Sequence, residues 1–146
     1  MQLDSAERER RQALVAAHYD AENALALEAI MATMSPDAEM IYNGQHFPDP
    51  ASIRWAHSYM GMSAQPGAFA GLKTLRDAEH FTADEVVVEG RVCGRHVGEF
   101  QGFAPTQREV ELPFVAFYRF DAQGLLTSER VVMNLGALES SPSSAS

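Results

Sequence analysis

The chain has 146 residues, 46% of them hydrophobic and 21% charged, which is typical of one globular domain and excludes a disordered or fibrous protein. Its net charge of −9 disfavours phosphate backbones and anionic lipids, so we expect neither nucleic acid nor a membrane as a partner. The single cysteine, Cys93, excludes a disulfide within the chain and a metal site made of several thiolates.

The N-terminal part has the pattern of a helix. Residues 4 to about 34 predict one long helix, which begins at Asp4 or Ser5, carries His18 on its apolar stripe, and ends before Ser35-Pro36. The charged N terminus lacks the apolar stretch of a signal peptide, and no run of about 18 apolar residues predicts a membrane span. We therefore expect a cytoplasmic protein.

A hairpin and a second helix are expected next. Residues 38–42 predict a short strand, Asn43-Gly44 a tight turn, and residues 45–47 a strand that pairs back. Residues 51–62 follow a Pro-Asp-Pro segment and have helical periodicity, which predicts a second helix.

The second half has the pattern of strands, at 72–81, 85–100, 106–120 and 124–134. Helices followed by such a run predict one α+β domain over residues 1–138, and the polar residues 139–146 are expected to form a flexible tail. Residues 112–118 are apolar on both faces of their strand. We expect helices to cover one face and a second copy of the chain to cover the other, which gives a homodimer.

A longer motif carries a family resemblance. Residues 94–110, GRHVGEFQGFAPTQREV, precede a long strand, Gly124 and a last strand that ends in Leu-Gly. Together with the upstream helix and the segment SPDAEMIYN, this resembles the SnoaL-like polyketide cyclase branch of the nuclear transport factor 2-like superfamily. The resemblance implies a cone-shaped α+β fold, in which a curved antiparallel sheet wraps around N-terminal helices and an apolar pocket opens at the mouth. It implies no single reaction, because this fold hosts cyclases, isomerases, dehydratases, epoxide hydrolases and binding modules.

The resemblance also implies candidate catalytic residues. In the cyclases an Asp on the last strand moves a proton, and the matching position is Asn134, whose amide can donate a hydrogen bond but cannot exchange a proton near neutral pH. Comparison with the steroid isomerases of the superfamily places His18, Tyr42 and Ala116 at their catalytic positions, with a different residue type at all three. We predict that His18, Tyr42 and Asn134 converge on one cavity, with His18 as the proton carrier.

Further residues are predicted around that cavity. The apolar wall is expected to include Trp55, Tyr59, Phe114, Ala116 and Tyr118. Arg130 shares the strand parity of Asn134, so it either faces the pocket or pairs with a carboxylate such as Glu22 or Glu129. His96 belongs to the family motif and is expected to tie down the backbone.

No cofactor is expected. His46, His57 and His80 are scattered without the spacing of metal ligands, and neither a phosphate-binding loop nor a nucleophile elbow occurs. Two functions stay open for the pocket and its small, apolar, oxygenated ligand. One is a cofactor-independent isomerase, cyclase or lyase-type enzyme that transfers a proton, and the other is a binding protein without catalysis.

Overall fold

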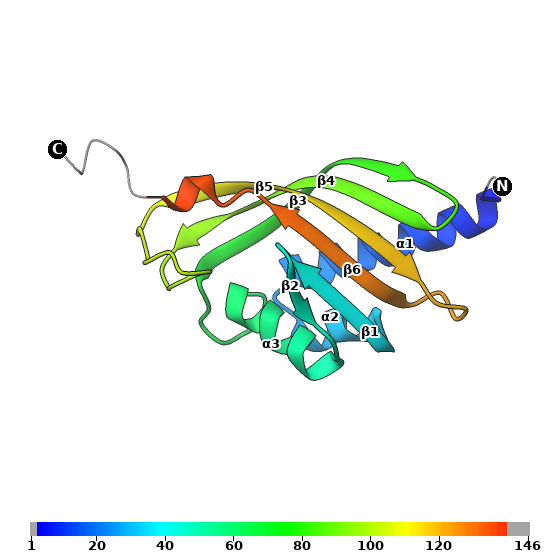
Figure 1. Ribbon diagram of the computed structural model, residues 1–146, viewed down its shortest axis with the longest axis horizontal. Helices are drawn as coiled ribbons and strands as arrows, with labels where there is room; N and C mark the ends of the chain where they lie inside the picture. Colours follow the sequence, from blue (N-terminus) through cyan, green and yellow to red (C-terminus); the bar gives the residue numbers. More distant parts are fainter. Residues whose placement is uncertain (1–2, 140–146) are drawn as a thin grey trace.

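The computed structural model describes residues 3–139 (Figure 1). In chain order its elements are α1 (Ser5–Asn23), α2 (Leu27–Ala32), β1 (Met34–Tyr42), β2 (Gln45–Phe47), α3 (Pro50–Met60), β3 (Phe69–Phe81), β4 (Glu85–His96), β5 (Glu109–Phe120), β6 (Leu126–Met133) and the 3-10 turn η1 (Gly136–Leu138). The predicted tail lies outside the described residues, apart from Glu139.

All six strands form one curved sheet in the order β2-β1-β6-β5-β4-β3, with the three helices on its concave side (Figure 1). The α+β class and the wrapped sheet are confirmed. The sheet is not wholly antiparallel as predicted, because β1 and β6 pair in parallel, with Ile41 opposite Arg130. These two strands lie at opposite ends of the chain. No hairpin connects them, so no turn imposes an antiparallel direction on the pair.

The predicted long helix is interrupted. α1 ends at Asn23, and the chain turns through Leu25, which has a φ of 55°. The amide of Leu25 donates to the carbonyl of Glu22, and the amide of Ala26 donates to that of Ala21, which is the Schellman pattern of helix ends. Glycine usually occupies the left-handed position of this motif, and Leu25 gives no such signal in the sequence.

α3, which is the second helix that the sequence predicts, and the hairpin of β1 and β2 follow their local sequence signals. Asn43 and Gly44 both have positive φ, as a tight hairpin turn requires. Asp49 caps α3 by accepting from the amide of Ser52 at 2.8 Å, and Pro50 follows at the first helical position. This cap orients α3 across the concave face of the sheet, where it contacts β1.

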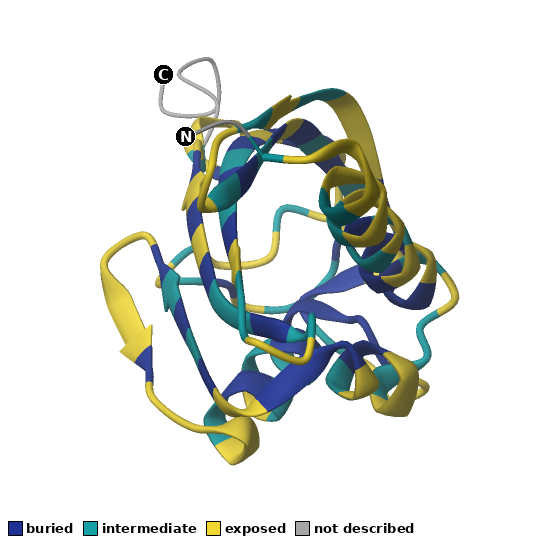
Figure 2. Ribbon diagram, turned by 90° about the vertical axis from the view of Figure 1, so that its right-hand side faces the viewer, coloured by how far each residue is buried: buried dark blue, intermediate teal, exposed yellow. Residues whose placement is uncertain are grey.

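Buried and exposed residues alternate along the strands (Figure 2). On β5, Leu112, Phe114 and Tyr118 face the interior, and Val115 and Phe117 are half-buried on the outer face. The side chain of Val132 on the neighbouring strand is 59% exposed. The outer face therefore presents apolar side chains that the single chain leaves in contact with water.

We expect a homodimer that buries this outer face. Val132→Lys should weaken the dimer, because it places a charge within the proposed contact. Sedimentation velocity at micromolar concentration is the measurement. A wild-type chain that sediments as a 16.0 kDa monomer would rule the dimer out.

Candidate functional site

A cavity of about 580 Å³, measured out to its open side, lies between the concave face of the sheet, α1 and α3. Most of its wall is apolar, formed by side chains such as Met40, Phe47, Met62, Phe100 and Val131. Its wall, largely apolar with a few polar groups, is that of a pocket for a small, largely apolar molecule.

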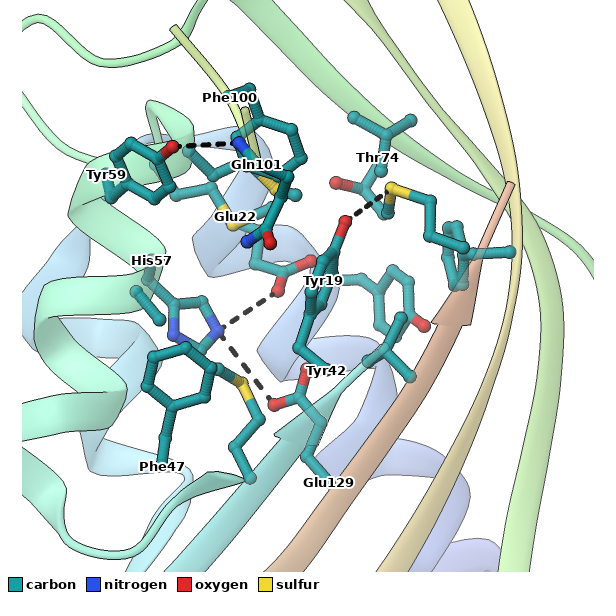
Figure 3. A pocket seen from close by; sticks show the side chains of 18 of the residues that line it. Tyr19, Glu22, Tyr42, Phe47, His57, Tyr59, Thr74, Phe100, Gln101 and Glu129 are labelled. Carbon is teal, nitrogen blue, oxygen red and sulfur yellow. Dashed lines mark hydrogen bonds and ion pairs between the residues drawn. The ribbon is translucent and has the colours of Figure 1, made fainter. Parts of the chain in front are cut away.

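The family motif shapes one edge of this cavity. Phe100 is buried against the cavity, and Gln101 beside it has a φ of 51°. The hydroxyl of Tyr59 accepts from the backbone amide of Gln101 at 3.0 Å (Figure 3). The same hydroxyl donates to Glu99 at 2.8 Å. Glu99 also accepts from the amide of Gly102 at 2.7 Å. The Gly-Glu-Phe-Gln-Gly segment is thus a turn fixed to α3.

Four ionisable side chains form a polar group beside the apolar wall: His18, Glu22, His57 and Glu129, here called the His/Glu cluster. The Nε2 of His18 lies 3.1 Å from Glu22 Oε2 and 3.5 Å from Glu129 Oε1. The Nε2 of His57 lies 3.5 Å from Glu22 Oε2 and 3.9 Å from Glu129 Oε1 (Figure 3). All four side chains are buried, and all but His18 line the cavity.

Three elements bring the cluster together. His18 and Glu22 are one turn apart on α1, so they lie on the same face of that helix. His57 comes from α3 and Glu129 from β6. On β6 the residues that face inward are Glu129, Val131 and Met133, which alternate with exposed ones.

Hydrogen bonds fix the orientation of both imidazoles. The Nδ1 of His57 donates to the carbonyl of Ile53 at 2.9 Å. The Nδ1 of His18 lies 2.8 Å from Thr33 Oγ1, whose own proton goes to the carbonyl of Ile30. Because that hydroxyl proton is already used, His18 Nδ1 must be the donor. Both rings therefore direct Nε2 toward Glu22 and Glu129.

The cluster changes the acidity of its members. Burial alone would raise the pKa of Glu22, but attraction and hydrogen bonding to His18 and His57 lower it to about 2. Burial raises the pKa of Glu129 by more than the two imidazoles lower it. For His57 burial works in the opposite direction, yet the two carboxylates raise its pKa to about 9. Glu22 is thus the stable anion of the cluster, and Glu129 is the carboxylate that ionises less readily.

Two tyrosines add hydroxyl groups to the wall. Tyr118 donates to the hydroxyl oxygen of Tyr19 at 2.7 Å, and both side chains are buried and border the cavity. The hydroxyl proton of Tyr19 then stays available for an oxygen atom in the cavity. Burial raises the pKa of both tyrosines, which keeps them protonated.

Some of the predicted residues meet at this cavity. Tyr42, Tyr59, Phe114 and Tyr118 line it, and Tyr42 donates to Met133 Sδ at 2.7 Å. His18 lies just behind the wall, within the His/Glu cluster. The motif residue His96 accepts from the amide of Thr106 through Nδ1 at 3.2 Å, which is the backbone role expected for it.

The predicted positions of Asn134 and Arg130 are wrong. Both residues alternate with the inward-facing residues Glu129, Val131 and Met133, so their side chains point outward. Asn134 is exposed, and its side-chain oxygen accepts from the backbone amide of Gly136 at 2.8 Å, so it holds the chain just before η1. Arg130 is exposed, and its guanidinium lies over the ring of Phe117 at 4.4 Å on the outer face.

Trp55 and Ala116 also lie outside the cavity wall that the sequence predicts for them. Trp55 is 55% exposed and stacks on Tyr59, with 4.9 Å between ring centroids. Ala116 faces inward, but its short side chain lies between Val88 and Val131 of the adjacent strands. Neither residue is among those that line the cavity.

The sequence pattern missed three members of the cluster as site residues: Glu22, His57 and Glu129. A helical His-x-x-x-Glu spacing links His18 to Glu22 and could have identified that pair. Glu129 and Met133 are four residues apart in the last predicted strand, so their side chains lie on the same face, and this could have indicated that Glu129 faces inward. For His57 the sequence offered only its place on one helical stripe with Ile53 and Met60, which are the buried residues of α3. It gave no sign of the partners of His57, because they come from other elements.

Comparisons with known proteins agree with this fold. A model of the SnoaL-like domain matches residues 15–129. The chain belongs to the SnoaL-like family. The resemblance to the SnoaL-like family is thereby confirmed. No curated protein is significantly similar to the chain in sequence.

Several solved structures are similar to this SnoaL-like chain. One, assigned as a SnoaL-like polyketide cyclase from Jannaschia sp. CCS1, is 21% identical with a TM-score of 0.78, over 97% of this chain and 100% of that one. AclR from Streptomyces galilaeus, assigned as a hydroxylase, is 24% identical with a TM-score of 0.71, over 88% and 81%. IdmH from Streptomyces antibioticus, assigned as a polyketide cyclase, is 20% identical with a TM-score of 0.70, over 88% and 94%.

Identities this low support the shared fold alone.

As to membranes, the helices within residues 3–139 are too short or too polar for any of them to cross a bilayer.

Proposed function

We propose that the protein is a small-molecule enzyme of the cyclase, isomerase or lyase type, which moves a proton on an apolar, oxygenated molecule held in the cavity. The observation that carries this proposal is the position of Glu129. It is a carboxylate on the last strand, it borders a largely apolar cavity, and its Oε1 is buried without a hydrogen-bond partner among the residues that the structure describes. A proton shift of this kind requires neither an organic cofactor nor a redox partner.

Glu129 takes the role that the family resemblance assigns to a last-strand Asp. That role was expected at Asn134, five residues further along the chain, and Glu129 is the carboxylate of β6 that faces the cavity. A carboxylate can accept a proton from a carbon next to a carbonyl group and return it elsewhere, which an amide cannot do.

The tyrosine pair suits the other end of such a substrate. The proton of Tyr19 can be donated to a carbonyl oxygen, and Tyr118 supports Tyr19 through the 2.7 Å hydrogen bond. This donor stabilises the negative charge that develops on the oxygen as the proton leaves the carbon. The apolar wall excludes water and strengthens both interactions.

Hydrogen exchange tests the proposal without knowledge of the natural substrate. A panel of apolar ketones and enones is incubated in deuterated water with the protein, and deuterium uptake next to the carbonyl is followed by mass spectrometry. We expect catalysed uptake in at least one compound by wild-type protein, with little uptake by Tyr19→Phe. Binding of panel members without any catalysed uptake would favour the alternative of a binding protein.

A further inference from the structure

The donor atoms of the His/Glu cluster have the spacing of a metal coordination sphere. Metal bonds of about 2.1 Å to nitrogen and oxygen place neighbouring donors about 3.4 Å apart in a tetrahedral site. Glu22 Oε2 lies 3.1 Å from His18 Nε2 and 3.5 Å from His57 Nε2. The donor atoms of all four side chains lie within 4.8 Å of one another.

Both imidazoles are held as metal-binding histidines are held. A ligating histidine usually donates its second ring N–H to a carbonyl, a carboxylate or another fixed acceptor, which orients the ring and fixes the tautomer. His57 donates from Nδ1 to the carbonyl of Ile53, and His18 donates from Nδ1 to Thr33 Oγ1. Once the Nε2 proton is released on metal binding, these contacts leave both Nε2 atoms to present lone pairs to a common centre.

Direct ion pairs explain the same arrangement less well. A protonated imidazole that bonds to a carboxylate approaches it to about 2.7–2.9 Å. The four nitrogen-to-oxygen distances in the cluster are 3.1, 3.5, 3.5 and 3.9 Å. In addition, Glu129 Oε1 is buried and has no hydrogen-bond partner within residues 3–139. Buried polar atoms of this kind call for a ligand that the protein itself does not supply.

We propose that His18, Glu22 and His57 bind one divalent transition-metal ion of the Zn²⁺, Fe²⁺ or Mn²⁺ class. Two imidazoles and one carboxylate suit these ions, whereas Mg²⁺ and Ca²⁺ prefer oxygen ligands alone. Glu129 lies beside the remaining coordination position, which opens toward the cavity. The sequence predicts no metal, because only His18 and Glu22 are one helical turn apart and His57 comes from a different helix.

Metal binding is measured on the full chain without any substrate, so the result does not depend on the proposed reaction. The protein is stripped with a chelator and titrated with Zn²⁺ against a chromophoric competitor, and Co²⁺ serves as a spectroscopic probe of the same site. We expect one Zn²⁺ per chain, a Co²⁺ absorption band that Zn²⁺ abolishes, and a rise in Tm of about 5–10 °C at a hundredfold excess over Kd.

Three variants test the assignment to residues. Glu22→Gln should weaken Zn²⁺ binding by about a hundredfold or more, because a neutral amide is a poor ligand. Thr33→Val removes the acceptor that orients His18 and should weaken binding by about 10- to 100-fold. His46→Ala is the matched control. It breaks an exposed histidine–glutamate contact of 3.0 Å to Glu39 and should leave binding unchanged.

The outcomes separate the two proposals. If the wild-type protein binds Zn²⁺ and Co²⁺ with a Kd weaker than about 0.1 mM, the metal site is overturned, because three protein ligands should bind far more tightly. This result needs only the wild-type protein, so it holds even if Glu22→Gln does not fold. Equal binding by folded Glu22→Gln and wild type would overturn it as well. If the metal-free protein still catalyses deuterium uptake, the proposed function stands without the metal. If the metal-loaded protein catalyses no uptake, the metal site stands and the proposed function does not.

Discussion

Replacement of Glu129 by Gln is expected to lower kcat for proton transfer by about 10²- to 10⁴-fold, the contribution of a positioned acid or base. The substitution keeps the shape of the side chain and removes its capacity to accept a proton. KM should change little, because most of the binding surface is the apolar wall. The measurement is steady-state deuterium uptake with the best compound of the panel, at saturating and subsaturating concentrations.

Glu111→Gln is the matched control for this variant. It makes the same chemical change at an exposed carboxylate on the neighbouring strand β5, and kcat should stay at the wild-type value. Asn134→Ala provides the decisive contrast, because Asn134 is the residue that the family pattern alone selects. If Asn134→Ala abolishes turnover and Glu129→Gln does not, the assignment of Glu129 is incorrect.

Gly90→Ala is expected to destabilise the fold by about 3 kcal/mol, at the upper end of the usual cost of overpacking. A Cβ atom at this position would lie 2.4 Å from the carbonyl oxygen of Leu75 and 2.7 Å from the ring of Phe114. The backbone of β3 and a ring that lines the cavity would both have to move. Denaturant unfolding followed by circular dichroism measures the loss, and the same shift should weaken ligand binding.

Gly94→Ala is the control on the same strand. Its Cβ would meet the carbonyl oxygen of Ala70 at 3.1 Å and no other atom closer than 3.4 Å, so a small displacement accommodates it. The destabilisation should be clearly smaller than at Gly90. Equal losses of stability would mean that the generic cost of replacing a strand glycine, rather than the close approach of β3 and Phe114, determines the result.

The sequence alone was sufficient to predict those parts of the structure that depend on residues close together in the chain. The turn at Asn43-Gly44 and the cap at Asp49 are local events, and both appear where predicted. The α+β class and the family follow from longer patterns of the same kind. The end of α1 was missed because Leu25 occupies a backbone conformation that glycine normally signals.

Only the tertiary structure decided which ionisable side chains meet at the candidate site. The segment Val131-Val132-Met133 is apolar at every position, so its pattern does not reveal which parity of β6 faces inward. The curvature of the sheet around α1 and α3 selects the parity of Glu129 and turns Asn134 to solvent. His57 meets Glu22 because α3 packs across the concave face. Such contacts between distant segments depend on packing, and no spacing within the chain encodes them.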